Sequence, residues 1–392
     1  MTPSIRKGTI PYAPSGTGDY TEEIFSLKGF FGEWAHLYRR RNLAHPVRWS
    51  DERLMYSGLD SGVLSAPDAS DPRGEPLRLM EGEGHAVSLS QRAAPMPFAE
   101  KNTDAHQIRF YHRGRFRLET ELGALDIEEG DFVVIPRGLI YRETPLGDEG
   151  NAVFVFETTA IIRPAKEMWD GVGYASLFID YSEIEVPEPA GDEDLGGETE
   201  VRVRCDGELH TMVYSHDPCR DVVGWIGDPL LFKMSIWAVP GAGTSRGHLT
   251  PPAGCVLLGE NKEFFFNALT MQPFPNTPSP NGSIGAPSHL NDYDELWLTH
   301  RSRIAPEDHL WLLPRTLPHP GFKMPTVYPP NPVQEIREMR LNFDTITPLR
   351  WTEEARAALF DNPVVAQYTS FMGLPPEAVP AHLRERSDAE TR

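Results

Sequence analysis

The chain repeats one pattern of strands, turns and a Pro-Arg pair in its two halves. The segment EGDFVVIPRGLIY (129–141) matches EDHLWLLPRTLPH (307–319) when the two Pro-Arg pairs are aligned. Upstream, NTDAHQIRFYHRGR (102–115) matches LNDYDELWLTHRSR (290–303). Self-similarity of this kind indicates a duplicated structural unit. Because both copies consist of short apolar runs separated by turn residues, we predict two antiparallel β units.

The composition also favours many short strands over helices. The chain has 33 glycines and 37 prolines among 392 residues, and both residue types favour tight turns. Only WTEEARAALFDN (351–362) has a helical pattern. The predicted fold class is therefore mainly β: duplicated antiparallel sandwich or barrel units with few short helices.

One acidic stretch rich in proline and glycine divides the two copies. IEVPEPAGDEDLGGETE (184–200) shows no apolar period, which is typical of a linker. We expect an N-terminal β domain over 1–183, a C-terminal lobe over 201–350, and a helix with a tail over 351–392.

Charge, cysteines and hydropathy exclude several classes of protein. A formal net charge of −20 argues against binding to duplex nucleic acid, which needs a basic face. The three cysteines are widely spaced, so a disulfide framework or structural zinc site is not expected. Neither a signal-peptide core nor a run of membrane length occurs. We expect a cytoplasmic protein with no nucleic-acid or membrane partner.

Three residues of the second copy can bind a metal, whereas their counterparts form no good ligand set for a divalent metal. The candidates are His289, Glu295 and His319, and their counterparts are Lys101, Gln107 and Tyr141. Two imidazoles and a carboxylate on one side of a metal leave other positions open, as in non-haem Fe(II) oxygenases. We predict that the second lobe binds a metal and that the first lobe has lost its ligands.

The spacing of the first two candidates restricts the local structure. Residues six apart in a straight strand lie about 20 Å apart, whereas the donor atoms on one metal lie within roughly 3–4 Å of each other. His289 must therefore end one segment, and Glu295 must begin the next strand. Asn291 and Asp292 between them are residues that form turns readily.

Other acidic and histidine residues nearby have structural interpretations. A lone histidine in a β protein is more often structural than a ligand. His300 repeats as His112 in the first copy, which favours a shared structural role. His309 corresponds to Asp131, and we expect it to cap a strand. Asp292 and Asp294 could replace Glu295 as the acidic ligand, but Asp294 would face the opposite side of its strand and Asp292 is needed in the turn.

Several segments carry a resemblance to a known family. The run from Gly130 to Tyr141 resembles the second motif of cupin barrels. His289 and Glu295 with Pro318-His319 resemble the ligand pattern of the homogentisate 1,2-dioxygenase family. Further similar segments, in chain order, are GFFGEWAHLYRRRN, SLSQRAAPMPF, VVGWIGD and GHLTPPAGCVLL. The resemblance spans roughly residues 30–321.

The resemblance implies an activity and roles for particular residues. Fe(II) would be bound by the three candidate ligands, and His248 would be the general base that deprotonates a hydroquinone-type substrate, since a histidine pKa lies near neutrality. The partners would be a small aromatic substrate and O2, and the family forms trimers and hexamers. Arg301, Ile304 and Tyr293 would contact the substrate.

Two positions depart from the family pattern, and one has a rival interpretation. Ile304 stands where family members carry tyrosine, and Leu313 where some carry histidine. These changes alter which ring substituent is accepted. Arg301 repeats as Arg113, which also fits a structural ion pair.

The sequence leaves other functions open. A metal-free bicupin that binds a small molecule, or an iron cupin oxygenase acting on a different phenol, fits the same pattern. The proline-rich segment 273–288 fits a lid and a connector equally well.

Overall fold

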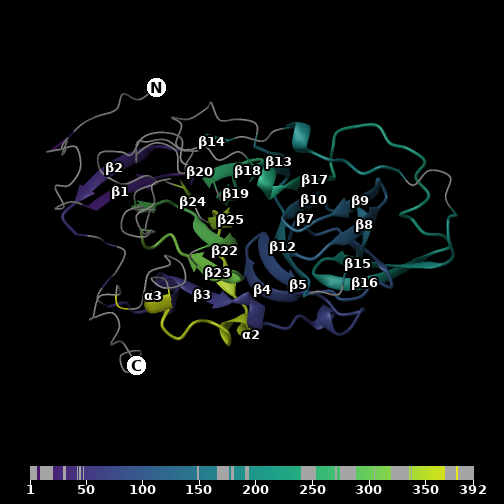
Figure 1. Cartoon of the computed structure of the whole chain (residues 1–392), viewed down its shortest axis with the longest axis horizontal. Helices are drawn as coiled ribbons and strands as arrows, with labels where there is room; N and C mark the ends of the chain where they lie inside the picture. Colours follow the sequence, from purple (N-terminus) through teal and green to yellow (C-terminus); the bar gives the residue numbers. More distant parts are fainter. Residues whose placement is uncertain are drawn as a thin grey trace.

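A computed structural model of the chain is shown in Figure 1. Strands make up most of its regular structure. The residues that the structure describes are 7–8, 21–29, 32–41, 43, 46, 48–147, 150–165, 176–177, 181–189, 194–239, 253–269, 272–273, 288–303, 305–318, 335–336, 338–366 and 377.

The first lobe consists of two sheets. The seven-stranded sheet contains, in spatial order, β17 (Phe232–Ser235), β10 (Asp131–Ile135), β7 (His106–Arg113), β12 (Ala152–Thr158), β5 (His85–Ser90), β4 (Leu77–Gly82) and β26 (Arg350–Trp351). The six-stranded sheet contains β16 (Glu208–Tyr214), β15 (Thr199–Cys205), β6 (Ala99–Asn102), β11 (Ile140–Pro145), β8 (Phe116–Thr120) and β9 (Gly123–Ile127).

The second lobe is built on one eight-stranded sheet, which Figure 1 shows beside the first lobe. Its strands are β13 (Ile162–Pro164), β18 (Ala253–Gly259), β19 (Phe264–Leu269), β25 (Glu338–Thr345), β22 (Asp294–Ser302), β23 (His309–Leu313) and β3 (Ser57–Asp60), with β14 (Ser176–Leu177) paired to β18.

The strand order confirms the duplication. The series β10-β7-β12-β5-β4 in the first lobe has the same order as β23-β22-β25-β19-β18 in the second. The registers agree as well, since Gln107 pairs with Glu157 and the matching Glu295 pairs with Asp344. The expected mainly β architecture of two duplicated antiparallel units with few short helices is therefore confirmed.

Alternation along the strands produces the layers of the molecule. Phe110 and Phe132 of the seven-stranded sheet pack in the largest core cluster with Phe266 and Leu298 of the second lobe. Neighbouring residues of the same strands, such as Tyr111, turn to the opposite face and pack with the six-stranded sheet. The seven-stranded sheet is thus a middle layer that is buried on both faces, as the period of two in a strand allows.

Strand pairing differs from the expected domain boundaries. Strands β15, β16 and β17 lie within 201–350 or just before it, yet they pair with strands of the first lobe. Strand β3, from the N-terminal part of the chain, pairs with β23 of the second lobe. The two lobes therefore exchange edge strands, because open sheet edges are stabilised by covering or pairing them.

Short elements complete the structure. A three-stranded sheet contains β2 (Trp34–Arg39), β1 (Thr21–Ser26) and β21 (Ser288–Leu290), and β20 (Gln272–Pro273) pairs with β24 (Glu335–Ile336). The described 3-10 helices are η1 (Glu52–Leu54), η2 (Ser61–Val63), η3 (Pro67–Ala69), η4 (Tyr181–Glu183) and η5 (Ile236–Ala238). The described α-helices are α2 (Glu353–Arg356) and α3 (Pro363–Ala366). Within the described residues, no helix has the length and apolar character needed to cross a membrane.

Candidate metal centre

His289 and Glu295 lie together at the start of β22. His289 is the middle residue of β21, and Glu295 is the second residue of β22, after an intervening turn. The Nε2 atom of His289 lies 3.4 Å from Oε1 of Glu295. Both side chains are buried, with 6% and 0% of their surface exposed. This separation is what two donors on one metal ion require.

The turn between these residues is held by its own side chains. Asn291 accepts a hydrogen bond from the Tyr293 backbone N–H at Oδ1 (2.8 Å) and donates from Nδ2 to Glu295 Oε1 (2.8 Å). Asp292 Oδ1 accepts from the Gly29 N–H at 2.9 Å. Asn and Asp thus direct the chain through the turn, and Asn291 also orients the carboxylate of Glu295.

The N-terminal hairpin supports His289 from the side. Strand β1 runs parallel to β21, with Ile24 opposite His289. Next to it, the buried Glu23 receives two hydrogen bonds from the guanidinium of Arg39, at 2.8 and 2.7 Å. A strand more than 260 residues earlier in the chain therefore positions this imidazole.

A second carboxylate faces Glu295 on the neighbouring strand β25. Asp344 is directly opposite Glu295 in the register and is 1% exposed. Its Oδ2 accepts from Asn267 Nδ2 at 2.7 Å, whereas its Oδ1 has no hydrogen-bond partner among the described residues. Burial, and then the neighbouring Glu295, raise the pKa of Asp344 well above its usual range. The alignment of the two repeats did not predict a role for Asp344, which lies outside the aligned segments.

Trp297 holds the other oxygen of Glu295. Its indole Nε1 donates to Glu295 Oε2 at 2.9 Å. Each carboxylate oxygen of Glu295 therefore accepts a hydrogen bond from a neutral donor, Asn291 or Trp297, which restricts its orientation.

Three predicted residues lie outside the described part of the chain. They are His248, Ile304 and His319. The described stretch before His319 ends at Pro318, whose carbonyl accepts a hydrogen bond from Tyr56. Leu313, at the end of β23, pairs with Glu295 and is fully buried. The end of β23, from which the chain continues toward His319, therefore lies beside Glu295.

The structure does not bring Arg301 to the His289–Glu295 pair. Arg301 lies six residues along β22 from Glu295, which is about 20 Å in a strand. Its guanidinium donates to Glu307 at 2.7 Å and also pairs with Glu129 of the first lobe. The structural ion pair suggested by the repeat is the arrangement found.

The hydroxyl of Tyr293 is also engaged elsewhere. It donates to the Lys262 carbonyl, and its ring packs on Phe265 with centroids 4.7 Å apart. Burial raises the pKa of Tyr293 above its usual range. This tyrosine supports the turn from the side of β19 and presents no free hydroxyl to a ligand at Glu295.

The rival residues have other partners. Asp294 accepts from the backbone N–H and Nε of Arg315, at 3.1 and 2.9 Å. His300 lies between the lobes, with its Nδ1 atom 2.9 Å from Nδ1 of His112. His309 lies 4.0 Å from the Asp60 carboxylate and packs on Phe360.

The described residues fit a divalent metal with nitrogen and oxygen ligands. An imidazole nitrogen and a carboxylate oxygen already converge, and two buried carboxylates at one place favour a cation. His289 and Glu295 would supply two of the ligands.

The equivalent position of the first lobe contains an ion pair of the protein itself. Arg109, the repeat counterpart of Trp297, donates from Nε and Nη2 to Glu143 at 2.9 and 2.6 Å. Its Nη1 reaches Gln107 Oε1 and Tyr141 Oη, both at 3.3 Å. Gln107 and Tyr141 are the counterparts of Glu295 and His319 in the sequence alignment. A guanidinium therefore lies among the side chains that replace the predicted ligands.

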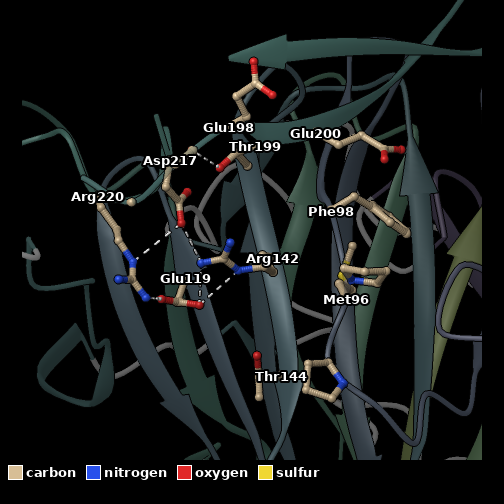
Figure 2. A pocket seen from close by; sticks show the side chains of 14 residues that line it. Met96, Phe98, Glu119, Arg142, Thr144, Glu198, Thr199, Glu200, Asp217 and Arg220 are labelled. Atoms are coloured by element: carbon tan, nitrogen blue, oxygen red, sulfur yellow. Dashed lines mark hydrogen bonds and ion pairs between the residues drawn. The ribbon is translucent and has the colours of Figure 1, made fainter. Parts of the chain in front are cut away.

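A separate polar pocket of about 470 Å³ lies on the first lobe. Figure 2 shows that Arg142 and Arg220 face Glu119 and Asp217 there. Arg142 Nη2 lies 2.9 Å from Glu119 and 2.8 Å from Asp217. Because carboxylates already neutralise both guanidinium groups, this pocket offers no excess positive charge to an acidic ligand.

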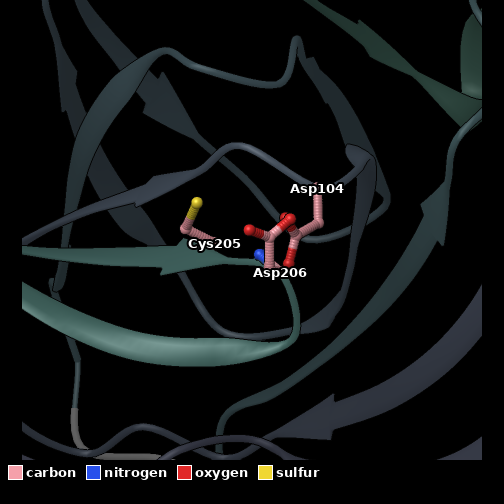
Figure 3. Close-up of side chains that lie close together, drawn as sticks. All are labelled: Asp104, Cys205 and Asp206. Atoms are coloured by element: carbon pink, nitrogen blue, oxygen red, sulfur yellow. The ribbon is translucent and has the colours of Figure 1, made fainter.

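A small acidic group with a thiol lies elsewhere on the first lobe, as Figure 3 shows. It consists of Asp104, Cys205 and Asp206. The Asp104 carboxylate accepts from the backbone N–H groups of Asp206 and Gly207, at 2.8 and 2.9 Å. These bonds close the turn between β15 and β16, so the group has a structural explanation.

Comparison with known proteins identifies relatives of the chain. A family model described as "Homogentisate 1,2-dioxygenase N-terminal" matches residues 83–236. A homogentisate 1,2-dioxygenase from Bradyrhizobium diazoefficiens is 31% identical over 136 residues, which cover 34% of this chain and 29% of that protein. One from Pseudomonas savastanoi pv. phaseolicola is 27% identical over 240 residues, covering 56% and 54%. The matches thus span about half or less of these relatives.

Solved structures give only a weak similarity. Protein Ylba from E. coli aligns with a TM-score of 0.36 and 9% identity, covering 74% of this chain and 90% of that one. The family model covers most of the first lobe, including the segments SLSQRAAPMPF and VVGWIGD, and it ends before His289 and Glu295. Over these matched residues, this chain is similar to the homogentisate 1,2-dioxygenases.

Proposed function

We propose that this protein is an Fe(II)-dependent ring-cleaving dioxygenase that inserts both atoms of O2 into homogentisate or a related hydroquinone or phenolic acid. The proposal depends chiefly on the buried His289–Glu295 pair, whose donor atoms lie 3.4 Å apart in a relative of the homogentisate 1,2-dioxygenases.

His289, Glu295 and His319 would hold the iron. Fe(II) supplies open positions at which O2 and a ring hydroxyl of the substrate can meet. Asn291 and Trp297 keep the Glu295 carboxylate in one orientation through a hydrogen bond to each oxygen. His248 would remove the proton of the substrate hydroxyl, because a histidine near its ordinary pKa can accept a proton at neutral pH.

The substrate is proposed only as a class. Leu313 is fully buried beside Glu295, where some family members carry a histidine. An apolar side chain discriminates weakly between ring substituents, whereas a hydrogen-bonding one discriminates strongly. The expected substrates are therefore homogentisate, gentisate, hydroquinone and substituted catechols, in a pocket less polar than the family pattern.

The test is O2 consumption by Fe(II)-loaded protein with that panel of phenols. We expect about one Fe per chain after anaerobic loading, as a single three-ligand site requires, and O2 uptake with at least one phenol. H289A should lose both bound iron and O2 uptake, because it removes a ligand.

A matched control is H210A, since His210 is an exposed residue of the edge strand β16. It should keep both properties of the parent. Iron-loaded protein that consumes no O2 with any phenol of the panel contradicts the proposed reaction. Protein that binds no iron points instead to a metal-free bicupin.

A further inference from the structure

Glu295 faces a second buried acidic residue across the strand pair β22–β25. Asp344 lies opposite it in the register, so both side chains project from the same face of the sheet. Cβ atoms of such cross-strand partners lie about 4.5–5.5 Å apart. Two ionised carboxylates at this separation repel strongly in a protein interior unless a positive charge lies between them.

The described surroundings of Asp344 do not supply that charge. The Asn267 amide that donates to Oδ2 is neutral. The other oxygen, Oδ1, is buried and accepts no hydrogen bond from the described residues. No described lysine or arginine forms an ion pair with Asp344. A buried carboxylate oxygen in this state is costly, which indicates a missing cationic or donor partner.

The first lobe shows how the same arrangement is stabilised by the protein alone. Glu157, the counterpart of Asp344, is opposite Gln107, whose Nε2 donates to it at 3.3 Å. Asn102 donates to Glu157 at 2.7 Å, and the Arg78 guanidinium forms an ion pair with it. The amide Gln107 thus stands where the second lobe has Glu295, and the carboxylate of Glu157 is paired with the cation of Arg78.

We propose that Asp344 is the second acidic group of the metal centre and that one divalent cation there balances the charges of Glu295 and Asp344 together. The inference rests on the proposed function, since it concerns the same site. Asp344 acts as a positioning residue: its charge strengthens cation binding at Glu295, and Asn267 holds it in place.

Titration of metal-free protein with Fe(II) under anaerobic conditions tests this role. D344N should bind Fe(II) about 10- to 100-fold more weakly than the parent, the usual effect of losing a group that supports a ligand. E157Q, the matched change in the first lobe, should leave the Fe(II) affinity unchanged. A D344N affinity equal to that of the parent overturns the inference and leaves the proposed function standing. A parent protein that binds no Fe(II) overturns both.

The melting temperature of metal-free protein gives an independent test that does not require iron. At alkaline pH, where both carboxylates of the metal-free protein are ionised, E295Q and D344N should each raise the melting temperature, because each removes the repulsion between the two carboxylates. The double variant E295Q/D344N should gain less than the sum of the two single shifts. Additive shifts, or single variants that melt below the parent, show that the carboxylates do not repel and overturn the inference.

Discussion

The two lobes have equivalent strands in the same register, but the buried polar side chains on those strands differ in charge. In the first lobe, Arg109 lies between Glu143 and Gln107, and every described group of this cluster has a hydrogen-bond partner. In the second lobe, the counterpart of Arg109 is Trp297. Glu295 and Asp344 occupy the positions that Gln107 and Glu157 have in the first lobe. In the first lobe, the Arg109 guanidinium neutralises Glu143, whereas no described lysine or arginine of the second lobe forms an ion pair with Asp344.

This difference follows from the cost of burying charge. A buried carboxylate is tolerated when it is paired and hydrogen-bonded, and it is strongly destabilising when it is not. In the second lobe, the divalent cation proposed above would balance the charge of Asp344, which has no ion-pair partner among the described residues. A duplicated scaffold can separate a structural lobe from a functional lobe by changing a few inward-facing residues.

The contact between the lobes shows a second asymmetry. A β-bulge in each lobe leaves one histidine, His112 or His300, outside the cross-strand pairing. The Nδ1 atoms of these two histidines lie 2.9 Å apart. Asp308 accepts from His112 at 2.7 Å. Its counterpart in the first lobe is Gly130, so His300 Nε2 has no described hydrogen-bond partner. Bulges re-aim side chains in this manner.

The largest effect is expected from removing the internal cation of the first lobe. R109A should lower the free energy of unfolding by about 3–5 kcal/mol, because Glu143 would remain buried without its partner. Chemical denaturation measures this loss. R117A is the matched control, since the Arg117–Asp126 pair is exposed and should contribute less than about 1 kcal/mol. Equal losses for both variants would contradict the comparison.

The next effect concerns acid stability at the contact between the lobes. Burial, and then the neighbouring His112, Arg301 and Arg113, lower the pKa of His300 from 6.5 to about 2, and Asp308 opposes them. The folded protein thus keeps His300 neutral, and the unfolded chain binds the extra proton below pH 6.5. Stability should fall by about 1.4 kcal/mol per pH unit as the pH drops from 6.5 toward 2.

Unfolding curves between pH 7 and pH 4.5 measure this slope, to which the buried His85 and His112 also contribute. H300Q should show a shallower slope by about one proton, because it removes one titrating group. An unchanged slope in H300Q would mean that His300 is not held neutral in the folded protein.

A smaller effect is expected from the amide that orients Glu295. N291A should weaken Fe(II) binding by about 10- to 100-fold, since it removes the hydrogen bond to Oε1 and loosens the turn. Anaerobic titration compares it with N102A, which changes a buried amide of the first lobe. If N102A weakens Fe(II) binding as much as N291A, the two lobes are not functionally distinct.

The smallest effect is expected at Arg301. R301Q should cost less than about 1 kcal/mol of stability, because the ion pairs with Glu129 and Glu307 are partly exposed. It should leave kcat/KM for the active phenol unchanged, since the side chain lies far along β22 from Glu295. A large increase in KM would instead support the substrate contact implied by the family resemblance.

Much of the fold could be predicted from the sequence. The repeat of Pro-Arg and His-Arg pairs, with alternating apolar residues, predicted two antiparallel units, and the registers of β7 and β22 confirm them. His289 and Glu295 lie on separate strands joined by a turn, as their spacing predicted. These features are local, because strand alternation and turn residues act over a few positions.

The sequence alone determined the net negative charge of the chain and its repeat of two β units. Which segments pair across long separations was decided only by the tertiary structure. It put β3 in the second lobe, β15–β17 in the first, β1 beside His289, and Asp344 opposite Glu295. The physical reason is that strand pairing depends on the packing of whole sheets and not on intrinsic preferences of short segments.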